Sequence, residues 1–342
     1  MHNSMDVDVT DPQLPLFSGT PVRTRLESIS TFLDWSHSRR ELMNQCLGTY
    51  YNKYYGANLL LAKSEPKKLQ LRFLKSLSNR HQRTGKILHL VISSYLKHFK
   101  DGDPWSIDRT VRWAREMFRA DLEYSREFMS RYGQGRYDIP IENDEGEANN
   151  RNPSLLAEYY YKWENAEDLC KTAEERLLNA LANFVTNEDL DWFRRGAVSD
   201  GSLIEARLSL REEHFRLTGR LDAAFQQEGR RVIVDWKIGG ESGGDDDLQL
   251  FAYSLPAIKE FQCQPEEIDL YKVFLTEAKF AKYTMSKKAV MRTRARIIQD
   301  VDRMRLLDPY GRDGVASAFT PCRRPRVCSN CIFQEVCPSA AS

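Results

Sequence analysis

The stretch Arg230-Arg-Val-Ile-Val-Asp-Trp-Lys-Ile238 carries the pattern that decides the fold. Alternation along a β-strand puts Ile233, Asp235 and Lys237 on one face and leaves the opposite face apolar. At a rise of about 3.3 Å per residue the two charges lie roughly 6 to 7 Å apart. A lone Asp-x-Lys pair on a buried strand is usually a salt bridge, and a metal site with its water is the alternative. The surrounding motifs must decide between them.

Length and composition restrict the class of protein. A chain of 342 residues can form one large domain with insertions, or two smaller ones. No apolar run approaches the ~20 residues of a membrane span, and the N-terminus lacks the basic and apolar regions of a signal peptide. We therefore expect a cytoplasmic protein without membrane contact. The sequence has no P-loop motif, so we expect no ATPase motor on this chain.

Charge is balanced overall but clustered locally. Fifty basic residues against 49 acidic ones argue against a purely electrostatic nucleic-acid coat. Residues 63–86 nevertheless hold eight Lys or Arg and one acid, and residues 279–296 hold seven and no acid. Each run is either a solvated helix face or a track for phosphates.

Periodicity predicts a helical part followed by a mostly stranded core, hence an α/β protein. Helices are expected over 24–61, from near 84, over 106–132 and over 154–195, with an exposed loop over 133–153. Strands are expected over 203–210, 213–225, 231–238 and 268–275. A turn at 239–247, ending in aspartates, leads into a further helix.

Other polar residues accompany the Asp-x-Lys pair. Asp222 ends the motif Thr218-Gly-Arg-Leu-Asp222, and a short turn at 226–229 should fold its strand back beside Asp235. Two carboxylates suit a hard divalent cation such as Mg²⁺ or Mn²⁺. Gln249 and Tyr253 lie four apart and so share one helix face.

Taken in order, G-x-x-D, D-x-K and Q-x-x-x-Y resemble the RecB-type nucleases of the PD-(D/E)XK superfamily. The segment Gly85-Lys-Ile-Leu-His89 resembles the G-x-x-x-H motif of the same family. The resemblance implies a restriction-endonuclease-like core, in which a mixed central sheet is flanked by helices. It also implies DNA as the partner and hydrolysis of phosphodiester bonds.

The resemblance assigns roles to individual residues. His89, Asp222, Asp235 and the carbonyl of Trp236 would hold the Mg²⁺ or Mn²⁺ ion. Lys237 would orient the attacking water and stabilise the phosphorane. Gln249 and Tyr253 would hold either the DNA backbone or the lysine. Glu205 matches an acid often present in the family, and a structural role for it stays equally open.

Three cysteines near the C-terminus form the pattern Cys328-x2-Cys331-x5-Cys337. Disulfides are improbable in a cytoplasmic protein, so metal ligation is the first interpretation. Zinc and iron-sulfur sites both want four ligands. Cys322 would complete a zinc-ribbon-like knuckle, and Cys46 is the remote candidate.

The surroundings of Cys46 favour the remote candidate. Ser36-His-Ser38 and Cys46 resemble the S-x-S-x7-C segment in the iron-sulfur branch of the RecB-type family, although Leu47 stands where proline is common. Similar patterns occur in the exonucleases of CRISPR adaptation and in the cluster-bearing nuclease subunits of bacterial recombination complexes. The resemblance implies a [4Fe-4S] cluster on Cys46, Cys328, Cys331 and Cys337, in preference to zinc. Cys170 and Cys263 are expected to be small buried residues.

We therefore expect four parts: a helical part with the first cluster cysteine and the histidine (1–100), a helical insertion (101–200), the nuclease core (201–310) and an iron-sulfur segment (311–342). The expected function is a metal-dependent DNA nuclease, acting on ends or single strands in repair, recombination or anti-phage defence. The alternative is a nucleic-acid-binding or scaffolding subunit of a helicase or defence complex, with latent or partner-gated cleavage. RNA cleavage and site-specific restriction are minor alternatives.

Overall fold

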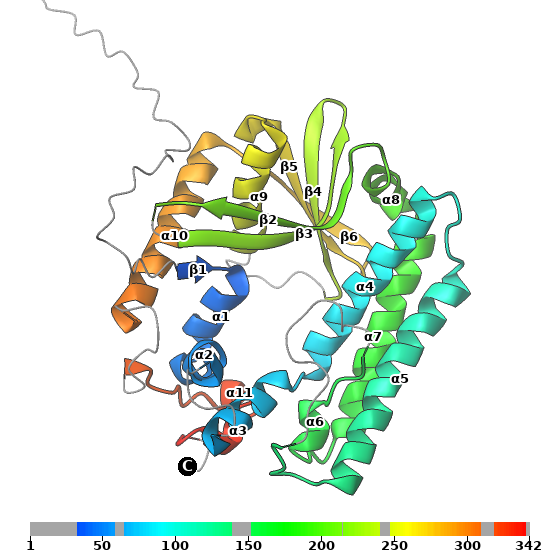
Figure 1. Cartoon of the computed structure of the whole chain (residues 1–342). Helices are drawn as coiled ribbons and strands as arrows, with labels where there is room; N and C mark the ends of the chain where they lie inside the picture. The colour runs from blue at the N-terminus through cyan, green and yellow to red at the C-terminus, as the bar shows by residue number, and fades with distance from the viewer. Residues whose placement is uncertain are drawn as a thin grey trace, which may run out of the picture.

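A mixed six-stranded sheet lies at the centre of the computed structural model, which describes residues 33–58, 65–138, 152–213, 215–239, 247–308 and 318–339. The order β1-β3-β4-β5-β6 runs across the sheet, and β2 pairs with the remaining edge of β3 (Figure 1). β1 is parallel to β3, β4 is parallel to β5, and the other pairs are antiparallel. The strands are β1 (Leu33–Trp35), β2 (Leu203–Arg211), β3 (Phe215–Gln227), β4 (Arg230–Lys237), β5 (Ile268–Phe274) and β6 (Lys279–Thr284).

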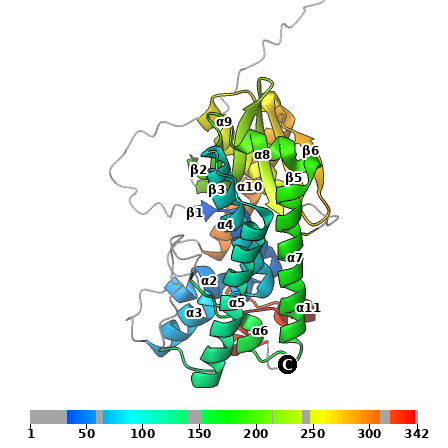
Figure 2. The same ribbon diagram turned by 90° about the vertical axis from the view of Figure 1, so that its right-hand side faces the viewer.

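Helices cover both faces of the sheet, and three long ones extend beyond it. α4, α5 and α7 run side by side from the sheet to a lower part of the molecule that contains α2, α3 and α6 (Figures 1 and 2). The helices are α1 (His37–Gln45), α2 (Leu47–Tyr54), α3 (Pro66–Ser76), α4 (Arg80–Lys100), α5 (Ile107–Arg131), α6 (Ala157–Tyr160), α7 (Ala166–Thr186), α8 (Asp191–Ala197), α9 (Leu248–Phe261), α10 (Lys287–Leu307) and α11 (Pro325–Cys328). In the described part of the chain no helix is long and apolar enough to cross a bilayer.

The alternation predicted for β4 is confirmed. Val232, Val234 and Trp236 pack in the core formed with α4, α5 and α7. Ile233 packs in the opposite core, formed with α9 and α10. The polar residues Asp235 and Lys237 share the face of Ile233 by alternation, so both charges sit beside α9, the helix that carries Gln249.

The β3–β4 hairpin is closed by Glu228 and Gly229, whose φ angles are +49° and +77°. Two left-handed central residues are the signature of a type I′ turn, whose twist matches that of the strands it joins. Gln227 and Arg230 consequently face each other, and the register continues to the pair Ala223 and Val234.

Other boundaries differ from the sequence prediction. Residues 33–35, predicted as helix, form β1, and the buried-intermediate-buried pattern of Leu33-Asp-Trp35 has a strand's period of two. β6 was not predicted, because it is an edge strand rich in exposed polar residues and it resembles a solvated basic run. α4 begins at Arg80, where Asn79 and Gln82 form a capping box. The predictions for residues 24–32, 59–61, 139–151 and 240–246 lie outside the described residues.

Candidate active site and cysteine cavity

The site lies where two strands leave a gap along one edge of β3. β1 pairs with β3 over Phe215–Leu217, and β4 pairs with it over 223–227. Both partners lie on the same edge, because β2 occupies the other one over 216–224. In the described sheet, residues 218–222 have no ladder partner on the shared edge. Asp222 is the last residue of this gap, and its side chain accepts a hydrogen bond from the backbone N–H of Trp236 on β4.

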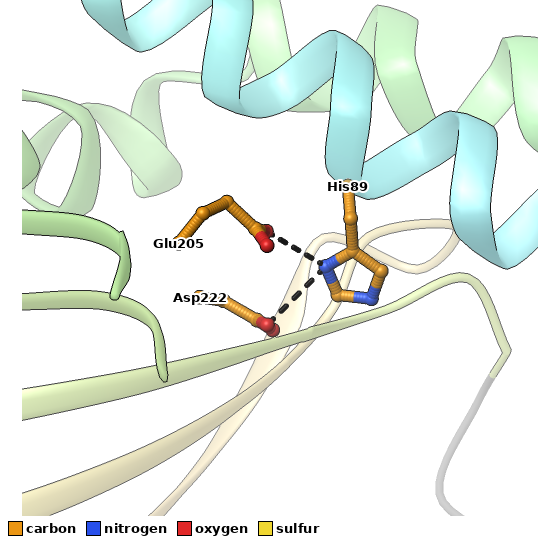
Figure 3. A group of neighbouring side chains, drawn as sticks. All are labelled: His89, Glu205 and Asp222. Carbon is orange, nitrogen blue, oxygen red and sulfur yellow. Dashed lines mark ion pairs between the residues drawn. The ribbon is translucent and has the colours of Figure 1, made fainter. Parts of the chain in front are cut away.

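Three potential metal ligands converge beside this gap. His89 of α4 points its Nδ1 at Asp222 Oδ1, 3.3 Å away, and at Glu205 Oε1, 3.5 Å away (Figure 3). One ligand atom from each residue lies within 4.8 Å of the other two. His89 and Asp222 were predicted as metal ligands. The sequence left the role of Glu205 open. In the structure its carboxylate lies close enough to His89 and Asp222 to bind the same metal ion.

Glu205 owes its position to an irregular backbone. Its φ is +52°, an uncommon conformation for a residue other than glycine. Ile204 packs toward the α4 side of the sheet, whereas Leu208 and Leu210 pack toward the α9 side. The alternation of β2 therefore reverses at Glu205, opposite Asp222. Backbone strain of this kind costs about 1 to 3 kcal/mol and tends to occur at functional sites.

Asp235 and Lys237 form the second half of the site. Lys237 Nζ lies 2.9 Å from Asp235 Oδ2 and 3.1 Å from Gln249 Oε1. Gln249 Nε2 in turn lies 3.5 Å from the Tyr253 hydroxyl. The predicted residues are thus brought together, with Lys237 between the sheet and α9. The backbone N–H of Trp236 donates to Asp222 Oδ2 at 2.7 Å and so ties the two halves together.

The electrostatics reflect an excess of acid. Burial opposes protonation of His89, but Asp222 and Glu205 outweigh it and raise its pKa to about 9. Burial raises the pKa of Asp222 to about 7; His89 opposes this shift, whereas Asp235 and Glu205 add to it. Burial lowers the pKa of Lys237, but the charges of Asp235 and Asp222 outweigh this effect. The net shift of the Lys237 pKa is therefore upward. Three carboxylates therefore crowd one lysine and one histidine.

The donor set fits a divalent cation. His89 Nδ1 is buried and lacks a well-directed hydrogen bond to any described group, although it faces two carboxylates. Carboxylate oxygens with one imidazole nitrogen suit Mg²⁺ and Mn²⁺. A dication would also balance the excess negative charge. Asp235, predicted as a further ligand, is held by Lys237 and lies outside the group of three.

Comparison with known protein families decides the assignment. The model of the PD-(D/E)XK nuclease superfamily matches residues 34–338, which include every residue of the site described above. The chain belongs to the PD-(D/E)XK nuclease superfamily. Its α/β fold, a mixed sheet flanked by helices, is consistent with this membership. Members of the superfamily are phosphodiester hydrolases that use divalent metals such as Mg²⁺ or Mn²⁺.

Comparison with individual proteins adds little to the family assignment. No curated protein matches this nuclease. A solved structure from Eubacterium rectale, provisionally named an exonuclease, is similar with a TM-score of 0.36 and 11% identity, covering 84% of this chain and 87% of that one. The structure of SSO0001 is similar with a TM-score of 0.28 and 14% identity, covering 53% of this chain and 82% of that one. Both scores are too low to carry an argument.

Five cysteines of the nuclease line one small cavity, although they come from opposite ends of the chain. The lining cysteines are Cys46, Cys322, Cys328, Cys331 and Cys337. The N–H of Cys322 donates to Cys46 Sγ at 3.3 Å, and Thr49 Oγ1 lies 3.2 Å from Cys331 Sγ. Hydrogen bonds to sulfur are typical of thiolates that ligate metal clusters. The cavity holds both the predicted fourth ligand, Cys46, and its rival, Cys322.

Proposed function

We propose that this chain is a metal-dependent DNA nuclease that acts on strand ends or single strands, as an exonuclease. The observation that carries the proposal is the convergence of His89, Glu205 and Asp222 beside Lys237. A bound Mg²⁺ or Mn²⁺ would acidify a coordinated water and offset the charge that develops on phosphorus. His89, Asp222 and Glu205 would hold the ion. Asp235 and the carbonyl of Trp236 remain candidate ligands.

The role of Lys237 follows from how it is held. Asp235 and Gln249 both bind its ammonium group, so its position is determined before substrate arrives. Pre-organised cations stabilise developing charge without the cost of reorienting solvent. We propose that Lys237 donates hydrogen bonds to the attacking water and to a non-bridging phosphate oxygen. Gln249 and Tyr253 act as positioning residues for the lysine.

The decisive experiment replaces the lysine. Lys237→Ala should fold normally and bind DNA, but cleave end-labelled single strands at least about 100-fold more slowly in Mg²⁺ or Mn²⁺. Lys259→Ala, which removes an exposed lysine from the end of α9, is the matched control and should keep wild-type activity. Wild-type protein that leaves every DNA form intact with either metal would refute the nuclease, and intact activity in Lys237→Ala would refute the proposed site.

We further propose that Cys46, Cys328, Cys331 and Cys337 hold a [4Fe-4S] cluster. The shared cavity and the hydrogen bonds to sulfur support this assignment. None of the proposed catalytic residues lines the cysteine cavity, and we assign the cluster a structural role. Iron and sulfide analysis of anaerobically purified protein tests it, and one zinc per chain without sulfide would overturn it.

A further inference from the structure

A cavity of about 580 Å³ opens directly beside the catalytic lysine. Helices α4 and α7 bound it on two sides, and the end of β4 with the β5–β6 turn bounds it on the others. His89 and Lys237 belong to its wall, so any group inside it is adjacent to the reacting phosphate. The volume lies within the range of about 300 to 1,000 Å³ that is usual for small-ligand sites.

The size of the cavity discriminates between forms of DNA. A sphere of this volume is about 10 Å across, less than the roughly 12 Å width of the major groove of a duplex alone. A double helix as a whole is therefore wider than the cavity and does not fit inside it. One unpaired strand can enter, because its backbone and bases pass one nucleotide at a time.

Gly85 leaves part of the cavity wall without a side chain. His81, Gly85 and His89 are spaced by four residues and form one stripe of α4. Glycine inside a helix costs about 0.5 to 1 kcal/mol relative to alanine. Gly85 has no positive φ, and a Cβ built on it would meet no heavy atom within 4 Å. Neither its own backbone nor packing within the described protein explains the glycine, whereas close approach of a ligand does.

The charge of the cavity wall is suited to phosphate. Arg176 of α7 lines the cavity and is exposed, and it forms no ion pair or hydrogen bond with any described residue. His81 lines it from the opposite helix. Burial and the charge of Arg80 lower the pKa of His81, and Arg176 lowers it further. An anion between the two would relieve this repulsion.

The acids near the cavity have other partners. Glu158, whose charge opposes the downward shift of the His81 pKa, accepts a hydrogen bond from Arg80 at 2.9 Å. Glu277 lines the rim and pairs with Lys279 at 3.6 Å. Arg176 and His81 are therefore left facing the cavity without a carboxylate ion pair among the described residues.

We propose that this cavity binds an unpaired nucleotide strand next to the scissile phosphate, with Arg176 and His81 contacting a neighbouring phosphate and the backbone passing over Gly85. This inference rests on the proposed nuclease function and adds to it a cavity for the strand and three positioning residues. Arg176 supplies a permanent positive charge for a phosphate, and Gly85 leaves space for the strand backbone. The protein thereby selects unpaired ends by shape as well as by charge.

The charge is tested by binding measurements in a Lys237→Ala background, which prevents cleavage. Fluorescence anisotropy of a labelled 12-nucleotide strand should show about fivefold weaker binding for Arg176→Ala, and its salt dependence should lose about 0.7 in slope, the share of one phosphate contact. Lys171→Ala removes the same charge from another exposed face of α7 and should change neither quantity. Equal behaviour of the two variants would overturn the proposal.

The space beside Gly85 is tested by substitutions that fill it with a side chain. Gly85→Leu should not lower the melting temperature, because leucine is the better helix former, but it should weaken single-strand binding at least tenfold. The single-strand affinity of Gly85→Ala should lie between that of Gly85→Leu and that of the Lys237→Ala parent. Mn²⁺ affinity measured by calorimetry should stay unchanged, which separates a blocked strand path from a damaged metal site. Wild-type strand affinity in Gly85→Leu, or equal affinity of the parent for blunt duplex, would refute the inference.

These measurements are independent of turnover. A wild-type protein without hydrolysis would refute the proposed function and still leave the binding comparison readable. Conversely, cleavage that depends on Lys237 but is indifferent to Arg176 and Gly85 would leave the nuclease intact and remove only this subsite.

Discussion

Gly219 has no side chain because Tyr253 occupies the space where one would lie. A Cβ on Gly219 would lie 2.7 Å from Cε1 of the tyrosine ring and closer still to Cδ1. The glycine of the G-x-x-D motif therefore lets α9 approach β3, which places Gln249 within reach of Lys237. At the scale of single residues, the motif is a packing requirement as much as a chemical one.

Enlarging this glycine should damage the site through the tyrosine. Overpacking of this kind costs about 1 to 3 kcal/mol, and we expect Gly219→Ala to lose that much unfolding free energy. In a Tyr253→Ala background the same substitution should cost less than about 0.5 kcal/mol, because the clashing ring is gone. A double-mutant cycle by chemical denaturation measures the coupling. Additive effects would show that the ring is not the obstacle.

The site residues differ in how far the sequence could predict them. Asp222, Asp235 and Lys237 stand in short motifs on adjacent strands, so alternation and a tight turn bring them close. Glu205 lies opposite Asp222 through a positive φ at a glutamate, and no local sequence signal announces it. The one available clue was that Glu205, on the strand preceding Asp222, matches an acid often present in the family, and that clue left a structural role equally open.

At the scale of elements, the site depends on how the strands of the sheet pair. β3 is long enough to accept β1 at one end and β4 at the other along a single edge. Asp222 lies at the end of the gap between these partners and contacts His89 of α4. β1 has only three residues and lies 180 residues before its partner, so sequence periodicity predicted helix there.

Ion pairs connect the neighbouring strands β4, β5 and β6. Asp269 of β5 accepts hydrogen bonds from Nε and Nη2 of Arg230, each at 2.8 Å. Its Oδ2 also lies 3.0 Å from Nζ of Lys282 on β6. The Arg230 hydrogen bonds, aided by Lys282, hold the pKa of Asp269 below its ordinary value despite some burial. This acid is buried, so removing its charge leaves two cations without their partner.

We expect Asp269→Asn to lower the unfolding free energy by about 1 to 3 kcal/mol at neutral pH. A depressed folded-state pKa means that the carboxylate stabilises above the unfolded value of about 3.9, and that this contribution is lost as pH falls through the folded pKa. The difference between wild type and variant should thus be constant from about pH 5 to 8 and shrink below about pH 4. Denaturation curves across this range check it, and a difference unaffected by acid would contradict the assignment.

At the scale of the whole molecule, the cysteine cavity joins residue 46 to the C-terminal segment. Tyr161 donates to the carbonyl of Ile332 at 2.7 Å, and Tyr137 donates to Glu335 at 2.6 Å, so the same segment also contacts the helical insertion. The proposed cluster would close a loop of nearly the whole chain and so remove entropy from the unfolded state. With the cluster bound, the cysteine segment would stabilise α2, the insertion at Tyr137 and Tyr161, and the C-terminal residues together.

Single substitutions distinguish the two possible fourth ligands. Cys46→Ala should lose iron and melt several degrees lower, because the long-range closure is gone. Cys322→Ala should keep its iron, and Cys263→Ala, which lies outside the cavity, serves as the control. Iron content and thermal melts measure both effects. Iron lost from Cys322→Ala but retained by Cys46→Ala would exchange the two roles.

The sequence alone was enough to predict the strands β2 to β5, the β3–β4 hairpin, helix α5 and the faces of β4, because each depends on backbone geometry within a few residues. Resemblance to a nuclease family extended this to His89 and Cys46. Tertiary structure alone decided that Glu205 joins His89 and Asp222, that β1 and β4 leave a gap beside Asp222, and that a cavity opens at Gly85. These features join segments a hundred or more residues apart, and packing of the whole chain, not local periodicity, determines which side chains meet there.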